Sequence, residues 1–196
     1  MATGFPSRHV LLTGPPGVGK TTLVRKACQL LKDESYPIKG FYTEEVRKDG
    51  HRIGFDVVTL DNQRGKLARL SESTYGLAGR RECRVGQYSV DVPSFECTAL
   101  PSLQLQKETD KVVCAVDEIG KMELFSSEFV HIVRHLFDNP KYAIIATLPI
   151  QRGRPITMVE EIRNRKDVTL FNVSKPNRDS ILEDIVNVLR TAFDQP

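Results

Sequence analysis

The sequence predicts an α/β protein in which helices cover both faces of a mostly parallel β-sheet. Short apolar runs of strand length alternate with longer segments whose apolar residues recur at helical spacing. That alternation is typical of parallel strands joined by helices, arranged in three layers. Between two strand-like runs, Lys48-Asp49-Gly50 predicts a tight hairpin turn, so part of the sheet is expected to be antiparallel. A length of 196 residues favours a single domain over residues 1–196.

The first expected elements flank a segment rich in glycine and proline. An apolar run at residues 9–13 predicts a buried strand, and helical spacing of apolar residues predicts a helix over residues 20–32. The runs on either side of the hairpin turn, residues 40–46 and 52–60, predict a pair of strands.

Residues 61–111 carry the weakest pattern, because glycine, arginine, serine and proline are scattered through them. Within this region a strand is expected at residues 85–92. A helix is expected at residues 94–106, broken or restarted at Pro101, because proline removes a backbone donor from a helix.

The second half of the chain returns to a regular alternation. Strands are expected at residues 112–118, 141–149 and 168–174, and helices follow them. The first of these strands is strongly apolar and ends in two acids. The expected helix starts are Ser126 or Ser127, Thr157 with Glu160 as a capping box, and Asn177.

Composition places the protein among soluble globular proteins. Hydrophobic residues make up 40% and charged residues 27%, and no apolar run approaches the length of a membrane span. The net charge of +3 is too small to indicate a nucleic-acid partner. The first residues do not resemble a secretory signal. We therefore expect a cytoplasmic monomer without nucleic-acid or membrane partners, in which buried cysteines such as Cys28 and Cys114 are unpaired thiols.

One segment has the form of a phosphate-binding loop, G-x-x-x-x-G-K-[ST], also called Walker A. It lies between an expected strand and an expected helix, which is the context that this motif requires. Glycines let backbone N–H groups turn towards phosphates, and the start of the helix adds a positive dipole end. Lys20 is expected to reach the β- and γ-phosphates as a catalytic cation, and the Thr21 hydroxyl to bind Mg²⁺. The segment consists of Gly14, Pro15, Pro16, Gly17, Val18, Gly19, Lys20 and Thr21.

The two acids after the apolar strand are candidates for the remaining chemistry. In proteins with a phosphate loop, such a strand ends beside the loop, so Asp117 is expected to hold Mg²⁺ directly or through water. Its neighbour Glu118 is expected to point elsewhere and to orient or polarise an attacking water as a catalytic residue. Acids that merely end a strand in solvent are the alternative.

Several further residues could assist. Thr147 ends the strand at residues 141–149 and could contact the γ-phosphate or a water, or be an ordinary threonine at a strand end. A second cation is expected to balance charge in the transition state. The candidates are Lys121, Arg81, Arg84, Arg163 and Arg165.

Two short strings imitate guanine-nucleotide motifs. Residues 117–120 fit D-x-x-G, and residues 164–167 resemble N-K-x-D with one departure. The second string precedes an apolar run instead of following a strand, so guanine selectivity is not expected. His131 and His135 have a helical spacing that could bind metal but lack a third ligand nearby, which favours a solvated helix face.

Seven segments together resemble the cancer-related nucleoside-triphosphatase family, whose relatives include the thermophile NTPases. They are GPPGVGKTT, GFYTEEVR, RIGFDVV, RECRVGQYSVD, DEIGKMEL, EEIRNRKD and FNVSKPNRD, and they span nearly the whole chain. The resemblance implies a RecA-like P-loop core and slow, Mg²⁺-dependent hydrolysis of several nucleoside triphosphates, such as ATP and GTP, to diphosphate and phosphate. It carries nucleotide binding over to the phosphate loop with Thr22, and to Val113, Cys114, Ala115, Val116, Asp117, Glu118, Ile119 and Gly120.

Two other functions fit the same motifs. A nucleoside or nucleotide kinase needs the same loop and Mg²⁺ but also a pocket for an acceptor, which residues 61–111 could supply. A nucleotide-gated binding module would bind the triphosphate and turn it over very slowly.

Overall fold

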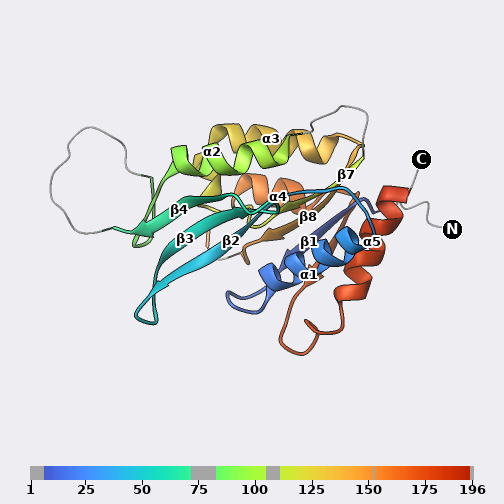
Figure 1. The fold of residues 1–196 in the computed structure, drawn as a ribbon, viewed down its shortest axis with the longest axis horizontal. Helices are drawn as coiled ribbons and strands as arrows, with labels where there is room; N and C mark the ends of the chain where they lie inside the picture. Colours follow the sequence, from blue (N-terminus) through green and yellow to red (C-terminus); the bar gives the residue numbers. More distant parts are fainter. Residues whose placement is uncertain (1–6, 72–82, 105–110, 152, 195–196) are drawn as a thin grey trace.

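The computed structural model describes residues 7–71, 83–104, 111–151 and 153–194. Strands and helices alternate at the start of the chain and again from residue 92 onwards, whereas the described part of residues 38–90 holds consecutive strands (Figure 1). The strands are β1 (His9–Thr13), β2 (Ile38–Lys48), β3 (His51–Thr59), β4 (Arg64–Leu70), β5 (Arg84–Val85), β6 (Tyr88–Val90), β7 (Val112–Val116), β8 (Tyr142–Leu148) and β9 (Val168–Asn172). The helices are α1 (Lys20–Asp33), α2 (Val92–Leu103), the 3-10 turn η1 (Glu123–Phe125), α3 (Ser127–Asp138), α4 (Thr157–Arg163) and α5 (Leu182–Asp194).

All the described strands belong to one sheet, in the order β5-β6-β4-β3-β2-β7-β8-β1-β9. From β2 to β9 the neighbours are parallel, and from β2 to β5 they are antiparallel. The predicted α/β class with a mostly parallel core is therefore confirmed. The antiparallel part is larger than the single predicted hairpin, because β4, β5 and β6 extend it.

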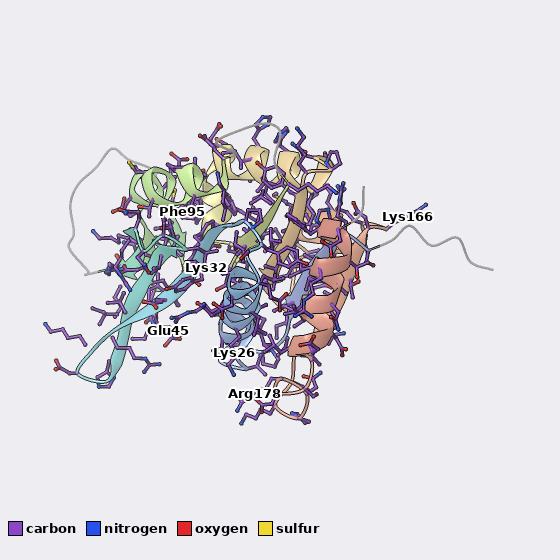
Figure 2. The ribbon with its side chains drawn as sticks, turned by 45° about the vertical axis from the view of Figure 1, so that its right-hand side comes forward. Lys26, Lys32, Glu45, Phe95, Lys166 and Arg178 are labelled. Atoms are coloured by element: carbon purple, nitrogen blue, oxygen red, sulfur yellow. The ribbon has the colours of Figure 1, made fainter. Side chains whose placement is uncertain are left out.

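The sheet separates two hydrophobic cores, which gives the three expected layers (Figure 1). Helices α1 and α5 pack on one face, and α2, α3 and α4 cover the other. Phe95 of α2 and Phe129 of α3 meet edge to face at 5.3 Å between ring centroids in the second core. Figure 2 shows Phe95 between α2 and the sheet. In the described part of the chain, no helix combines the length and the apolarity that crossing a bilayer requires.

Local signals fixed several boundaries as expected. Asp49 and Gly50 both have positive φ, 50° and 78°, as a two-residue hairpin turn requires, and Lys48 pairs with His51 across it. The Ser126 side chain accepts a hydrogen bond from the Phe129 N–H and caps α3.

Other boundaries differ from the prediction. The expected strand at residues 85–92 is a short hairpin of β5 and β6 with its turn at Gly86. Helix α2 begins at Val92 instead of residue 94, because the Asp91 carboxylate accepts from the Ser94 N–H. It is not broken at Pro101, which lies in its last turn, and it continues to Leu103 although proline donates no backbone N–H.

Helix α4 begins at Thr157 as expected, but the predicted cap of this helix and the predicted start of the last helix are wrong. The capping box at Thr157 is absent, because Ile156 occupies the cap position and no side chain caps α4. Asn177 does not open the last helix, which starts at Leu182. Its side chain instead accepts from the Ser174 N–H at 2.8 Å and so stabilises the preceding turn.

Candidate active site

The segment Gly14–Thr21 joins the carboxyl end of β1 to the start of α1, as the motif requires. A Cβ at Gly14 would come within 2.4 Å of the Val173 carbonyl oxygen, so only glycine fits where the loop leaves the sheet. Gly19, at the helix cap, has φ 112°, a left-handed conformation that other residues rarely adopt. These two glycines let the loop curl around the end of α1.

The start of α1 is left open to a ligand. No side chain caps its first N–H groups, and its first turn contains no acidic residue. These N–H groups and the positive end of the helix dipole favour an anion. The Lys20 ammonium donates to the Gly14 carbonyl at 2.9 Å and to the Pro15 carbonyl at 3.4 Å, so it lies over the same loop.

Asp117 follows β7 and is buried, with 1% of its surface exposed. Its carboxylate accepts from the Thr147 hydroxyl at 2.5 Å and from the Thr43 N–H at 3.4 Å, and the Thr21 side chain lies near enough to lower the pKa of this carboxylate. Burial raises the pKa of Asp117, and the hydrogen bonds and the Lys20 charge oppose that rise. Thr147 thus orients a carboxylate that the sequence places beside the loop.

Thr21 and Asp117 are the residues predicted to hold Mg²⁺, and the structure brings their side chains together. A hydroxyl and a carboxylate are oxygen ligands of the kind that Mg²⁺ prefers, and this ion usually completes its shell with waters and phosphates. The donor set therefore fits the ion. His131 and His135 are both exposed on α3, as expected for a solvated helix face.

Glu118 faces the opposite side of the sheet from Asp117. Along β7, Val113 and Ala115 pack in the core with α1, whereas Cys114 and Val116 pack in the core with α2 and α3. Beyond the end of the strand, Glu118 lines a cavity with Phe55 and Leu67 on the side of α2 and α3, whereas Asp117 lies near Thr21 at the start of α1. Burial raises the pKa of Glu118 to about 7. The positive charge of Lys20 opposes this rise, and the negative charge of Asp117 adds to it.

The side chains of Val113 to Val116 are fully buried, so β7 positions the two carboxylates that follow it. Direct nucleotide contact by this segment, and by Ile119 and Gly120, stays a prediction. The same is true of Thr22, which is exposed at the first turn of α1.

The predicted extra cations are dispersed. Arg165 binds Asp167 and Asp138 at the amino ends of β1 and β9, whereas the phosphate loop follows the carboxyl end of β1. Arg84 donates to Ser71 at 2.7 Å on the antiparallel edge of the sheet, and Arg81 lies outside the described residues. Lys121 and Arg163 line a cavity that Glu118 also lines.

The string at residues 164–167, which includes Arg165, lies just before β9 and so away from the phosphate loop. Figure 2 shows Lys166 and Arg178 well separated, on either side of β9 along the chain. The expectation that this string does not read guanine agrees with its position. Cys28 and Cys114 are buried and unpaired, as predicted.

Two residues beside the site were not anticipated. The Arg178 guanidinium donates to the Val18 carbonyl at 3.4 Å, which ties the turn after β9 to the phosphate loop. Glu123 is buried, and its carboxylate accepts from the Gly120 N–H at 3.1 Å. Burial and the Glu118 charge raise the pKa of Glu123 to about 8. Both residues belong to segments that carry the family resemblance, but no sequence signal marks Glu123 as buried.

A sheet that is parallel from β2 to β9, a glycine loop at the start of a helix and a carboxylate beside Thr21 define a P-loop protein of the three-layer α/β class. A family model described as NTPase matches residues 9–186. The chain therefore belongs to the NTPase family, which is a family of enzymes.

Similar proteins are found with full-length coverage. The human protein named cancer-related nucleoside-triphosphatase is 54% identical over 192 residues, which are 95% of this chain and 98% of the relative. A solution structure of a human cancer-related nucleoside triphosphatase superposes with a TM-score of 0.82 at 52% identity and covers 97% of this chain and 100% of that one. The crystal structure of THEP1 from Aquifex aeolicus has a TM-score of 0.77 at 36% identity, with 92% and 98% covered.

Proposed function

We propose that this protein hydrolyses nucleoside 5'-triphosphates, ATP and GTP among them, to the diphosphate and phosphate in a Mg²⁺-dependent reaction. The observation that carries the proposal is the meeting of Thr21 and Asp117 at the open start of α1. The names of the similar proteins, nucleoside-triphosphatases, support the same reaction.

The side chains have separate roles in this proposal. The N–H groups of the loop and the Lys20 ammonium bind the β- and γ-phosphates. Thr21 and Asp117 hold Mg²⁺, which neutralises charge on the phosphates when bound. Thr147 and the Thr43 N–H fix the orientation of Asp117. Glu118 accepts a hydrogen bond from the attacking water and aligns it with the γ-phosphorus.

Base specificity is expected to be broad. The only string that resembles a guanine-reading motif lies before β9, and the phosphate loop follows the other end of its neighbour β1. Nucleotide binding then depends on the Mg²⁺-bound triphosphate, a group that all nucleoside triphosphates have in common. A monomer in the cytoplasm remains our expectation for its state and location.

The test is the Glu118→Gln variant, which keeps the size of the side chain but removes its basicity. We expect phosphate release to fall about 100-fold with nucleotide affinity retained. Glu128→Gln, on the exposed face of α3, is the matched control and should behave like the wild type. Unchanged turnover in Glu118→Gln would remove this residue from the mechanism. Absence of Mg²⁺-dependent phosphate release by the wild type would favour a nucleotide-gated binding module.

A further inference from the structure

The cavity lined by Glu118, Lys121 and Arg163 lies on the face of the sheet opposite to α1. It has a volume of about 330 Å³, and the described residues that line it include none of Gly14–Thr21. Its walls come from β2 to β5, the loops after β7 and β8, and α4. Most of the lining is apolar, with Phe55, Leu67, Val85, Met122, Ile150 and Ile156 among the contributors.

Glu118 connects this cavity to the phosphate loop. Its side chain lines the cavity, and its carboxylate lies close enough to Lys20 for their charges to interact. Among the described residues, no side chain or N–H group hydrogen-bonds to the Glu118 carboxylate, although most of the Glu118 side chain is buried. The carboxylate oxygens are not fully enclosed, so a molecule in the cavity can donate a hydrogen bond to them.

Glu123 and the terminal nitrogens of Arg163 already have partners in the interior of the cavity, whereas the buried Arg163 Nε has none among the described residues. Glu123 accepts from the Gly120 N–H at 3.1 Å. Arg163 binds Glu160 at 2.8 Å and the Pro149 carbonyl at 3.2 Å. Glu118 is thus the carboxylate that remains available to a ligand.

The size and lining of the cavity exceed what hydrolysis requires. One attacking water occupies about 30 Å³, roughly a tenth of this volume. Apolar walls hold additional water poorly, whereas they favour the apolar body of an organic molecule. Lys121 and Arg154 line the cavity and are exposed, so they can interact with negative charge at its mouth.

We infer that this cavity binds a small alcohol with an apolar, ring-sized body, and that the protein transfers the γ-phosphate to its hydroxyl group. The inference rests on the proposed function, because the phosphate donor is the same bound triphosphate. The alcohol oxygen forms a bond to the γ-phosphorus while the bond from that phosphorus to the β–γ bridging oxygen breaks. The diphosphate leaves with the electron pair, and the hydroxyl proton passes to Glu118 and then to solvent. Water reacts in the same way when no alcohol is bound.

The test measures ADP, the nucleoside diphosphate product, and free inorganic phosphate in the same reaction. The wild type is incubated with MgATP and each of benzyl alcohol, pyridin-3-ylmethanol, uridine and adenosine, with glycerol as a polar alcohol that lacks a ring. We expect at least one ring alcohol to give more diphosphate than phosphate, with the difference recovered as a phosphate monoester by ³¹P NMR. Glycerol should give equal amounts.

Two variants test whether the cavity is responsible. Ile150→Trp fills it from a loop and should lower the monoester yield about tenfold, with phosphate release in the absence of alcohol unchanged. Leu170→Trp, on the exposed surface of the edge strand β9, is the matched control and should retain the yield.

The outcomes separate the two proposals. Equal diphosphate and phosphate with every alcohol would overturn the inference and leave the hydrolase intact. Equal monoester yields in Ile150→Trp and the wild type would also overturn it, because the acceptor would then bind elsewhere. Diphosphate formed only when an alcohol is present would support the inference and overturn hydrolysis as the main activity.

Discussion

Acidification is expected to weaken the fold through His9, a fully buried residue at the start of β1. Its Nδ1 accepts from the Ile144 N–H at 3.2 Å, which requires a neutral ring nitrogen. Burial, assisted by the nearby Arg8 charge, lowers the pKa of His9 from 6.5 to about 3. In the unfolded chain the same ring takes up a proton near pH 6.5. The stabilising effect of neutral His9 is therefore present above pH 6.5 and is lost as the pH falls towards 3.

The size of the effect follows from that pKa difference. Between pH 6.5 and 5.0 each pH unit removes about 1.4 kcal/mol from the free energy of unfolding, so His9 alone accounts for about 2 kcal/mol between pH 7.5 and 5.0. Urea unfolding at the two pH values measures this loss. The His9→Asn variant keeps an acceptor for the Ile144 N–H but does not titrate, so it should lose about 2 kcal/mol less than the wild type over the same interval. Equal losses in the two proteins would refute the assignment.

Three predictions concern the proposed activity. Lys20→Ala should lower kcat/KM for MgATP by about 2 to 4 kcal/mol in transition-state terms. Lys26→Ala, on the exposed side of the same helix, should not, and steady-state kinetics that showed equal effects would contradict the role of Lys20. Thr147→Val removes the hydrogen bond to Asp117 and should raise the Mg²⁺ concentration for half-maximal activity by about 10-fold or more. An unchanged Mg²⁺ titration would argue against that role. Chelation of Mg²⁺ with EDTA should stop phosphate release reversibly, and release that continued would exclude the proposed metal dependence.

The elements that could be predicted from the sequence are those with a local cause. A glycine loop needs positive φ at fixed positions, and Ser126 caps a helix through its own neighbours, so both are legible in a few residues. Strand β4 was missed because Leu67 and Ala68 are both buried, which breaks the alternation of a strand. Phe55 of β3 pairs with Ala68 and Asp56 with Lys66, so the pairing skips Leu67, and this bulge in β4 explains the break.

The candidate site likewise has one part that the sequence predicts and another part that it does not. The position of Asp117 beside Thr21 follows from the order of the strands, and the sequence motif predicts it. The cavity next to Glu118 does not follow, because distant segments of the chain build its walls. Burial of Glu123 in a single 3-10 turn likewise depends on the packing around it and not on its neighbours in sequence.

The two acids after β7 are held in place by hydrogen bonds on both sides of the strand. Val116 pairs with Phe41 of β2 and with Ala146 of β8, so a shift of this strand by one position would have to break both ladders. Such a shift would exchange the two carboxylates between the layers that they face. Insertion or deletion of one residue in β7 should therefore abolish activity even where the protein still folds, whereas substitutions at the two acids can be made independently. Asp117 and Glu118 have separate proposed roles, in binding the metal and in accepting a proton. The hydrogen bonds of β7 to β2 and β8 nevertheless fix the positions of both residues together.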